Sequence, residues 1–199
     1  MHTELIEQVY FSFFERFRPL EDKERVALLE NTTLKTFPKG HYFVREGDLE
    51  KDCFFILKGC VREYRIKDAE EITSNFYIEH EFALSLDSFA KGVPSPNFLQ
   101  CIEDTTVAIG GEEDSKKLFE TCPSLESLAM QIMEEGMGRL HKQMTEYMSN
   151  SPEERYLNLM NEKPDLLQRV PQYQLASFIG VKPESLSRIR RRLTTLKVS

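Results

Sequence analysis

The sequence has 199 residues, which corresponds to one large domain or two small ones. Hydrophobic residues make up 40% of it and charged residues 30%, so it is expected to fold as a globular protein with a substantial core. The 26 Lys and Arg against 33 Asp and Glu give a formal charge of -7, which for the whole chain argues against a nucleic-acid binder, because such domains are usually basic.

Two features of the sequence predict the cellular compartment of the protein. No apolar run approaches the ~20 residues of a membrane span, and residues 1–4 lack the basic and apolar regions of a signal peptide. The cysteines have no metal-binding spacing, and without an export signal they are expected to be reduced and buried; they are Cys53, Cys60, Cys101 and Cys122. We therefore expect a cytoplasmic protein with no membrane partner.

The first 31 residues are predicted to be helical. Apolar residues recur every four positions in the first helix, at Val9, Phe13 and Phe17. A second short helix is expected over residues 21–31, and its apolar side comprises Val26, Leu28 and Leu29.

From residue 34 to about residue 111, glycines separate short apolar runs. Strands are expected over 41–45, 53–57, 61–66, 71–79, 98–103 and 105–110, with turns at 36–40, 46–48 and 58–59. Residues 61–66 alternate apolar with charged side chains, as a half-buried strand does. Many short strands with regular turn signals predict a sandwich or a barrel.

A long helix is expected after residue 121, with Pro123 in its first turn. Six residues in it follow the 3, 4, 3, 4, 3 spacing of a heptad seam: Met130, Met133, Met137, Leu140, Met144 and Tyr147. This stripe either packs on the chain's own barrel or pairs two copies of the chain as a coiled coil. Its flanks are polar, and so narrow a stripe favours the dimer. Ser151 and Glu154 then form a capping-box pattern that opens the next helix.

Residues 172–193 contain two short amphipathic helices. The first covers 172–179 and is closed by Gly180, and Pro183 can open the second, which is the pattern of a helix-turn-helix. One face of the second helix is apolar and is expected to pack on the first helix: Leu186, Ile189, Leu193 and Leu196. The opposite face carries Glu184, Arg188, Arg191 and Thr195, with Ser187 beside it and Arg190 and Arg192 on the flanks. Glu184 is the one carboxylate expected near these arginines.

The charge is distributed unevenly along the chain. From residue 169 onward there is one acid, Glu184, against seven basic residues: Arg169, Lys182, Arg188, Arg190, Arg191, Arg192 and Lys197. That segment carries +6, and residues 1–168, with 19 basic and 32 acidic residues, carry -13. A basic tail would not place leucines and isoleucine at helical spacing, so the pattern favours a folded surface for an anionic partner.

Motifs at both ends of the chain resemble a known family. They are PKG at 38–40, REGD at 45–48, FFILKGCV at 54–61 and LASFIGVKPESLSR at 175–188. The first three are similar to the cyclic-nucleotide-binding β-roll, and the last to the helix-turn-helix, of the Crp/Fnr family of bacterial transcription regulators. The resemblance implies an α+β chain: a double-stranded β-helix (jelly roll) over 1–121, a dimerisation helix over 122–150 and a helix-turn-helix domain over 151–199.

The resemblance also implies a function, a homodimeric regulator that binds near-palindromic double-stranded DNA and is not an enzyme. It places the base-reading residues at Glu184 and Arg188, where arginine can bind guanine O6 and N7 and the carboxylate can accept from cytosine N4. The further DNA-facing residues are Lys182, Ser187, Arg190, Arg191 and Arg192, of which the basic ones suit phosphates. RNA polymerase is a third candidate partner, beside DNA and a second copy of the chain.

The residues that would hold a cyclic nucleotide in this family are missing. Its Phe-Gly-Glu segment looks like residues 82–84 here, with Leu84 in the carboxylate's place, and its arginine falls near Ser95 and Pro96. A buried phosphate without a cation costs several kcal/mol, so cyclic AMP is not expected as the effector. A candidate apolar effector pocket comprises Phe82, Leu84, Phe89, Ser95 and Phe98. No cofactor is predicted, because the cysteines are not clustered as iron–sulfur ligands and the histidines are isolated.

Two other function classes compete with DNA binding. One is a small-molecule sensor whose helical C-terminal part contacts a protein partner, which the unusual Lys182 and Pro183 leave open. The other is an enzyme on a double-stranded β-helix, which needs clustered His and Glu metal ligands that this chain lacks. A steep salt dependence of binding would distinguish DNA from a protein partner.

Overall fold

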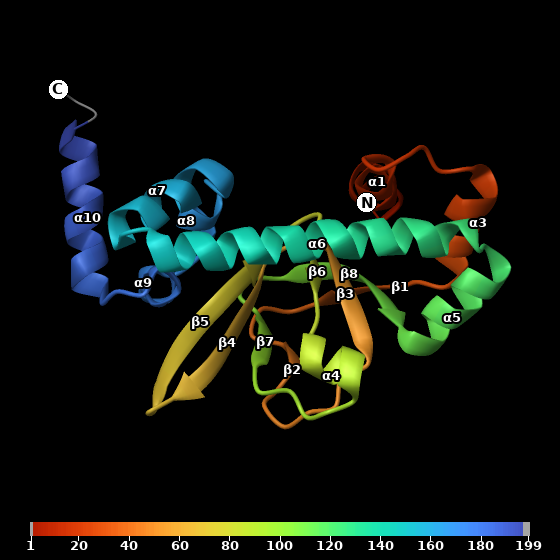
Figure 1. Cartoon of the computed structure of the whole chain (residues 1–199), viewed down its shortest axis with the longest axis horizontal. Coiled ribbons are helices and arrows are strands. Elements are labelled where there is room, and N and C mark those ends of the chain that lie inside the picture. Colours follow the sequence, from red (N-terminus) through yellow and green to blue (C-terminus); the bar gives the residue numbers. More distant parts are fainter. Residues whose placement is uncertain (1, 197–199) are drawn as a thin grey trace.

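The structure, a computed structural model, describes residues 2–196 (Figure 1). N-terminal helices are followed by a group of strands, which we call the roll (residues 33–111), then by one long helix and finally by a group of helices, which we call the head (residues 151–196). The predicted α+β class and the N-terminal jelly roll are confirmed.

The roll consists of two four-stranded antiparallel sheets, with strand orders β1-β8-β3-β6 and β2-β7-β4-β5. Its strands are β1 (Thr33–Phe37), β2 (Tyr42–Val44), β3 (Asp52–Lys58), β4 (Val61–Lys67), β5 (Glu70–Tyr77), β6 (Phe82–Ala83), β7 (Phe98–Cys101) and β8 (Thr105–Gly111). The six predicted strands are confirmed to within a few residues. The short elements β1, β6 and the helix α4 (Leu86–Lys91) were not predicted, because so few residues show no periodicity.

A buried apolar cluster lies between the two sheets, and Phe43 stacks on Phe54 within it, with ring centroids 4.3 Å apart. The turn between β3 and β4 depends on Gly59. Its φ is 116°, and a Cβ atom there would lie 2.6 Å from the Thr105 hydroxyl oxygen. Only glycine therefore fits at this turn, which explains the Lys58–Gly59 signal in the sequence.

The N-terminal helices cover one sheet with aromatic side chains. They are α1 (His2–Leu5), a π-helical turn η1 (Ile6–Phe11), α2 (Ser12–Glu15) and α3 (Asp22–Glu30). Phe13 packs edge-on against Phe55 of β3, with centroids 4.9 Å apart. The predicted apolar side of α3 is wrong in part: Val26 and Leu29 are exposed, whereas Glu24 is buried. The reason is that Glu24 forms an ion pair, which draws its side of the helix inward.

Glu24 joins the N-terminal helices to the long helix. Both of its oxygens accept from Arg18, at 2.6 and 2.7 Å, and it also accepts from the Ser124 hydroxyl and the Glu21 backbone. The hydrogen bonds from Arg18 above all lower the pKa of Glu24 from 4.5 to about 2, although its burial works in the opposite direction. The charged form of this carboxylate therefore stabilises the fold.

Glu24→Gln is expected to lower the free energy of unfolding by about 3 kcal/mol at pH 7 and by little near pH 2. A carboxylate with a depressed pKa in the folded state contributes fully above its ordinary pKa of 4.5, and this contribution is lost as the pH falls towards 2. Urea unfolding at both pH values measures the difference, with the exposed Glu30→Gln on the same helix as control. Equal losses at both pH values would contradict the assignment.

The long helix α6 (Ser124–Ser149) follows the shorter α5 (Glu112–Thr121) and runs from the N-terminal helices to the head (Figure 1). Leu125 and Leu128 are buried and pack with the N-terminal helices. The head contains α7 (Pro152–Glu162), α8 (Leu166–Arg169), α9 (Gln172–Ile179) and α10 (Pro183–Leu196). The predicted capping box is confirmed, because Ser151 accepts from the Glu154 backbone and Glu154 accepts from that of Ser151.

Candidate nucleic-acid interface

Helices α9 and α10 have the predicted order of a helix-turn-helix, joined by residues 180–182. The turn depends on Gly180, which has a φ of 79° and would bring a Cβ atom to 2.6 Å from the Tyr147 hydroxyl. Leu186 and Ile189 are buried against the rest of the head, and Leu193 packs beside them. The apolar face of α10 is thus turned inward, as its spacing predicts.

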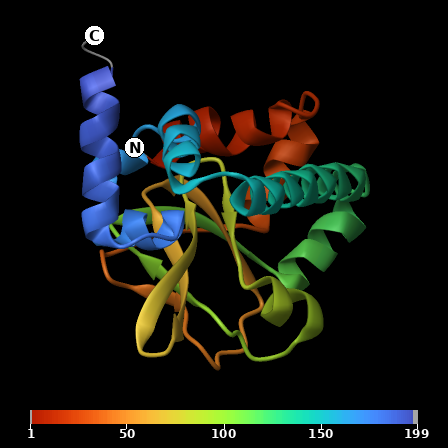
Figure 2. The same cartoon turned by 60° about the vertical axis from the view of Figure 1, so that its left-hand side comes forward.

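The opposite face of α10 is open to solvent. Among the residues predicted to contact DNA, Arg190 is half-buried, and the others are exposed: Lys182, Glu184, Ser187, Arg188, Arg191 and Arg192. Helix α10 stands at the outer edge of the molecule in both views, beyond the end of α6 (Figures 1 and 2). The predicted contact residues are therefore brought to one outward surface. The side chains of Thr195 and Leu196, and the whole of Lys197, lie outside the described residues.

Local contacts differ among these side chains. Arg188 donates to the Ser185 hydroxyl at 3.1 Å, and Ser187 donates to the Pro183 carbonyl. Arg192 forms an ion pair with Glu153 of α7. The expectation that Glu184 alone would lie near the arginines is therefore wrong, because α7 folds back beside α10 and brings a second carboxylate.

The six predicted seam residues of α6, here called the methionine stripe, are all more than half exposed. The exposed fractions are 60% for Met130, 64% for Met133, 70% for Met137, 58% for Leu140, 56% for Met144 and 51% for Tyr147. A different side of α6, with Leu125 and Leu128, packs against the chain's own N-terminal helices. Within one chain, the stripe does not pack on the barrel.

Arg155 connects the long helix to the helix-turn-helix, and no sequence signal pointed to it. Its guanidinium donates to the carbonyls of Tyr147 and Asn150 at the end of α6, and to that of Ile179 at the end of α9, at 2.8 to 2.9 Å. It also lies over the Tyr147 ring, 4.5 Å from the centroid. Free carbonyls at helix ends need such donors, so Arg155 holds two helix ends together.

Of the residues predicted to form an effector pocket, Phe82 and Phe98 lie in strands of different sheets, and Phe89 lies in α4. Phe82 packs with Phe13 and Phe55 under the N-terminal helices, whereas Phe98 of β7 stacks on Tyr64 at a centroid distance of 5.0 Å. Leu84 and Phe89 are half-buried, and Ser95 is buried. The structure does not bring Phe82 and Phe98 together in one group.

Polar groups inside the roll form a connected network of hydrogen bonds that sequence reasoning missed. Ser85 donates to the Ser95 hydroxyl at 2.8 Å, and the Ser95 hydroxyl in turn donates to the Asn97 carbonyl. The Asn97 amide and the Tyr77 hydroxyl both donate to the Glu63 carboxylate, at 2.8 and 3.1 Å. Burial raises the pKa of Glu63, against the hydrogen bonds that favour its charge. These polar groups satisfy one another.

The described part of the chain contains no helix that is long and apolar enough to cross a membrane. Among residues 2–196, no group of three or more His, Cys, Asp or Glu side chains is arranged so that it could hold a metal ion.

Both the roll and the whole chain are similar to known proteins. Residues 34–122 match the family of cyclic nucleotide-binding domains. The global regulator CLP of Xanthomonas campestris, described as responsive to c-di-GMP, has a TM-score of 0.67 and 16% identity, over 88% of this chain and 92% of that chain. The catabolite activator protein of Thermus thermophilus has a TM-score of 0.55 and 22% identity, over 92% and 87%. FixK2 of Bradyrhizobium japonicum has a TM-score of 0.66 and 14% identity, over 83% and 86%.

Among curated protein sequences, none matches this chain. CLP is described as a global regulator, and the Thermus protein as a catabolite activator. The predicted resemblance is confirmed by a shared fold that covers most of both chains in each comparison. Residues 34–122 are thus similar to cyclic nucleotide-binding domains, and the chain as a whole has the fold of these three proteins.

Proposed function

We propose that this protein is a transcription regulator that binds double-stranded DNA through α10 and acts as a homodimer on a near-palindromic site. The observation that carries the proposal is the outward face of α10. It presents Arg188 and Glu184 to solvent, side chains that can read guanine and cytosine edges, while Leu186 and Ile189 anchor the helix in the head. These two residues are surrounded, on the same helix or at its start, by Lys182, Ser187 and Arg190 to Arg192.

A second copy of the chain is the partner that fits the methionine stripe. The stripe keeps heptad spacing over most of α6, is exposed in the single chain, and ends beside the head at Tyr147. Two parallel α6 helices would place both heads at the same end of the dimer, and α10 stands at that end in the single chain (Figure 1). Two recognition helices could then enter successive major grooves about 34 Å apart.

Selection from random duplex DNA with the purified chain tests this function. The expected result is enrichment of an inverted repeat whose half-site centres lie about one helical turn apart, because a symmetric dimer reads the same half-site twice. Failure to enrich any inverted repeat, in a sample shown to be folded by circular dichroism, would overturn the proposal. The competing function, in which the head binds a protein partner and not DNA, would then be favoured.

Binding to the selected DNA is expected to weaken roughly 10³-fold or more between 50 and 200 mM salt, if each dimer neutralises six or more phosphates. The physical reason is the release of counterions when Lys182 and the arginines of α10 meet the backbone. Fluorescence anisotropy at several salt concentrations measures the slope. A flat slope would show that the basic face of α10 does not meet phosphates.

We further propose that cyclic AMP does not control this protein. The Ser95 hydroxyl is already engaged by Ser85 and Asn97, and a phosphate inside the roll would approach the Glu63 carboxylate. A negative charge beside a half-buried carboxylate is destabilised at low dielectric. Equilibrium dialysis with labelled cyclic AMP should detect no binding, and saturable binding with one nucleotide per chain would contradict this.

The proposed regulator has three parts, whose boundaries we place after residues 121 and 150. These boundaries fall between α5 and α6 and between α6 and α7. We place the protein in the cytoplasm, where DNA and RNA polymerase are accessible to it, and assign it no cofactor.

A further inference from the structure

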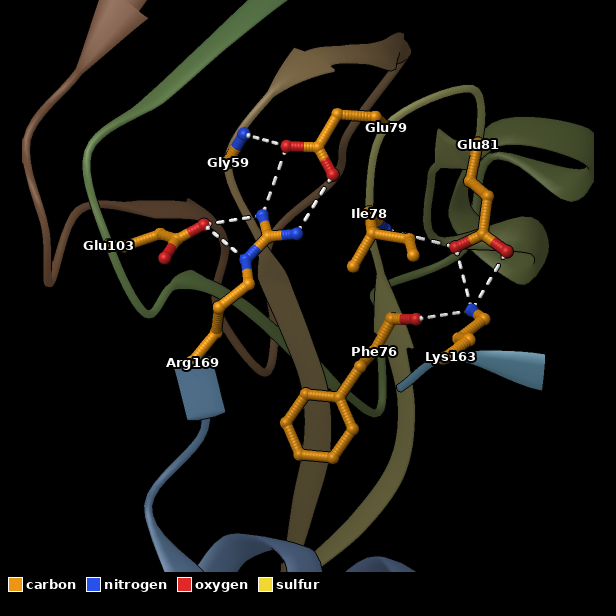
Figure 3. A network of polar contacts seen from close by, with 8 residues as sticks. All are labelled: Gly59, Phe76, Ile78, Glu79, Glu81, Glu103, Lys163 and Arg169. Atoms are coloured by element: carbon orange, nitrogen blue, oxygen red, sulfur yellow. Dashed lines mark hydrogen bonds and ion pairs between the residues drawn. The ribbon is translucent and has the colours of Figure 1, made fainter. Parts of the chain in front are cut away.

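Polar side chains of the head meet the roll at three places (Figure 3 shows two of them). Lys163 follows α7, Arg169 ends α8 and Ser177 lies in α9, so the head supplies one residue from each of three helical segments. Their partners on the roll lie on β5, on the loop that follows it and at residue 103. We call these three contacts the clamp.

The centre of the clamp is the guanidinium of Arg169. It binds the Glu79 carboxylate with two parallel hydrogen bonds of 2.9 and 3.0 Å, and it binds Glu103 with two more of 3.0 and 2.5 Å. Glu79 also accepts from the Gly59 backbone at 2.8 Å. Although burial disfavours its charge, these bonds hold the pKa of Glu79 below its usual range. Such two-pronged pairing fixes orientation as well as distance.

A second ion pair lies beside the first. The Lys163 ammonium contacts both oxygens of Glu81 at 2.8 Å and donates to the Phe76 carbonyl at 2.9 Å. Glu79 and Glu81 flank His80, whose φ of 66° makes a tight turn, and the backbone of that turn is bonded to Ile56 of β3. The loop is therefore bonded to the sheet through its backbone and to the head through its two carboxylates.

The third contact is at the edge of a sheet. The Ser177 hydroxyl accepts from the Thr73 backbone at 3.0 Å and donates to the Glu71 carbonyl at 2.9 Å, which satisfies the free edge of β5. Phe178 packs edge-on against Phe76 next to it, with centroids 5.4 Å apart. The helix before the recognition helix is thus fixed directly to the roll.

Beside the ion pairs, roll and head share a buried apolar cluster that includes Cys60, Phe76 and Ile102 of the roll and Leu166 and Val170 of the head. The ion pairs of Arg169 lie at an open hollow of about 530 Å³, which is lined by Lys39, Lys58, Gly59, Glu79, Glu103, Asp104 and Arg169. Loss of Arg169 would leave Glu79 and Glu103 without the guanidinium that pairs with both of them. The head is therefore held on the roll by apolar packing together with directional ion pairs that solvent can reach.

We propose that Arg169 is a positioning residue for DNA binding, which through Glu79 and Glu103 holds the head on the roll in the orientation that presents α10 to DNA. This inference rests on the proposed function. The direction of the effect follows from the place of α10, which in the clamped chain stands beyond the end of α6 (Figures 1 and 2). Its Arg188, Arg191 and Arg192 are exposed. Without the clamp, apolar packing alone would hold each head, and the spacing between the two heads of a dimer would be less firmly fixed.

The test is a double-mutant cycle on DNA affinity with Arg169→Gln, Glu79→Gln and the double variant, using the duplex selected with the unchanged protein. Each single variant is expected to bind about tenfold more weakly, and the double variant no more weakly than the weaker single one, because both remove the same pair. Lys116→Gln is the matched control: it removes one positive charge and an ion pair on α5, away from the head, and should bind normally.

Hydrogen exchange separates positioning from loss of fold. In Arg169→Gln the Thr73 amide, which donates to Ser177, should exchange faster, while the amides of β8 inside the sheet keep their protection. Normal affinity of both single variants, or additive losses in the cycle, would overturn the proposed role of Arg169. If the unchanged protein selects no DNA, the proposed function fails, whereas selection with an unaffected Arg169→Gln variant refutes the clamp alone.

Discussion

Leu140→Asp should convert the protein into a monomer and weaken its binding to the selected DNA roughly 10²-fold or more, because two linked heads bind far more tightly than one. Leu140 lies in the middle of the methionine stripe and is 58% exposed in the single chain. The substitution therefore leaves the fold of the chain intact, but would bury a carboxylate without a partner in the dimer. Analytical ultracentrifugation measures the assembly and fluorescence anisotropy the affinity.

Gln143→Asp is the matched control for this prediction. It adds the same charge and the same helix-weakening residue to α6, but on a polar flank of the stripe, so the dimer and its affinity for DNA should persist. If Leu140→Asp remains a dimer, the methionine stripe is not the dimer interface. If the Leu140→Asp variant is monomeric and still binds the selected DNA with undiminished affinity, the protein does not bind its site as a dimer.

Arg188→Ala is expected to lose ~1–3 kcal/mol of discrimination at one base pair of each half-site, because the two-pronged contact with guanine disappears. Arg188 is exposed on α10 and donates a hydrogen bond to the neighbouring Ser185, so the fold does not depend on it. The measurement is affinity for a set of duplexes that differ at single positions of the selected site.

Lys182→Ala provides the comparison. Lys182 stands exposed at the start of α10, where a phosphate contact would fix position without reading sequence. This variant should bind all duplexes more weakly by the same factor and reduce the salt slope by about one, with no change in base preference. Should Arg188→Ala behave in the same uniform way, Arg188 would be a phosphate contact and not a base-reading residue.

Periodic patterns predicted the parts of this fold that local sequence controls. The apolar spacing of Leu186 and Ile189 predicted which side chains of α10 face inward. The alternation in β4 did so in part, because Arg62 is buried and Ile66 is exposed, and the heptad residues of α6 are exposed in the single chain. Glycine signals at Gly59 and Gly180 were informative because both turns lack room for a Cβ atom. The whole-chain charge of -7 conceals an uneven distribution, in which residues 169–199 carry +6 and residues 1–168 carry -13.

Contacts between distant segments could not be predicted in this way. Arg169 and Glu79 are 90 residues apart, and Ser177 and Thr73 are 104 apart, so no spacing rule connects them. The network of Glu63, Tyr77 and Asn97 inside the roll was missed for the same reason. The effector pocket remains a prediction, because its aromatic residues resemble ordinary core residues in the sequence, and the structure places Phe82 and Phe98 in different sheets.

The most direct test of DNA reading by a dimer through α10 is a hydroxyl-radical footprint on the selected duplex, with the number of chains per duplex determined by native mass spectrometry. Two chains per duplex and two symmetric protected tracts, with centres about one helical turn apart, are the predicted result. One chain per duplex with a single protected tract, or protection that does not depend on sequence, would contradict it.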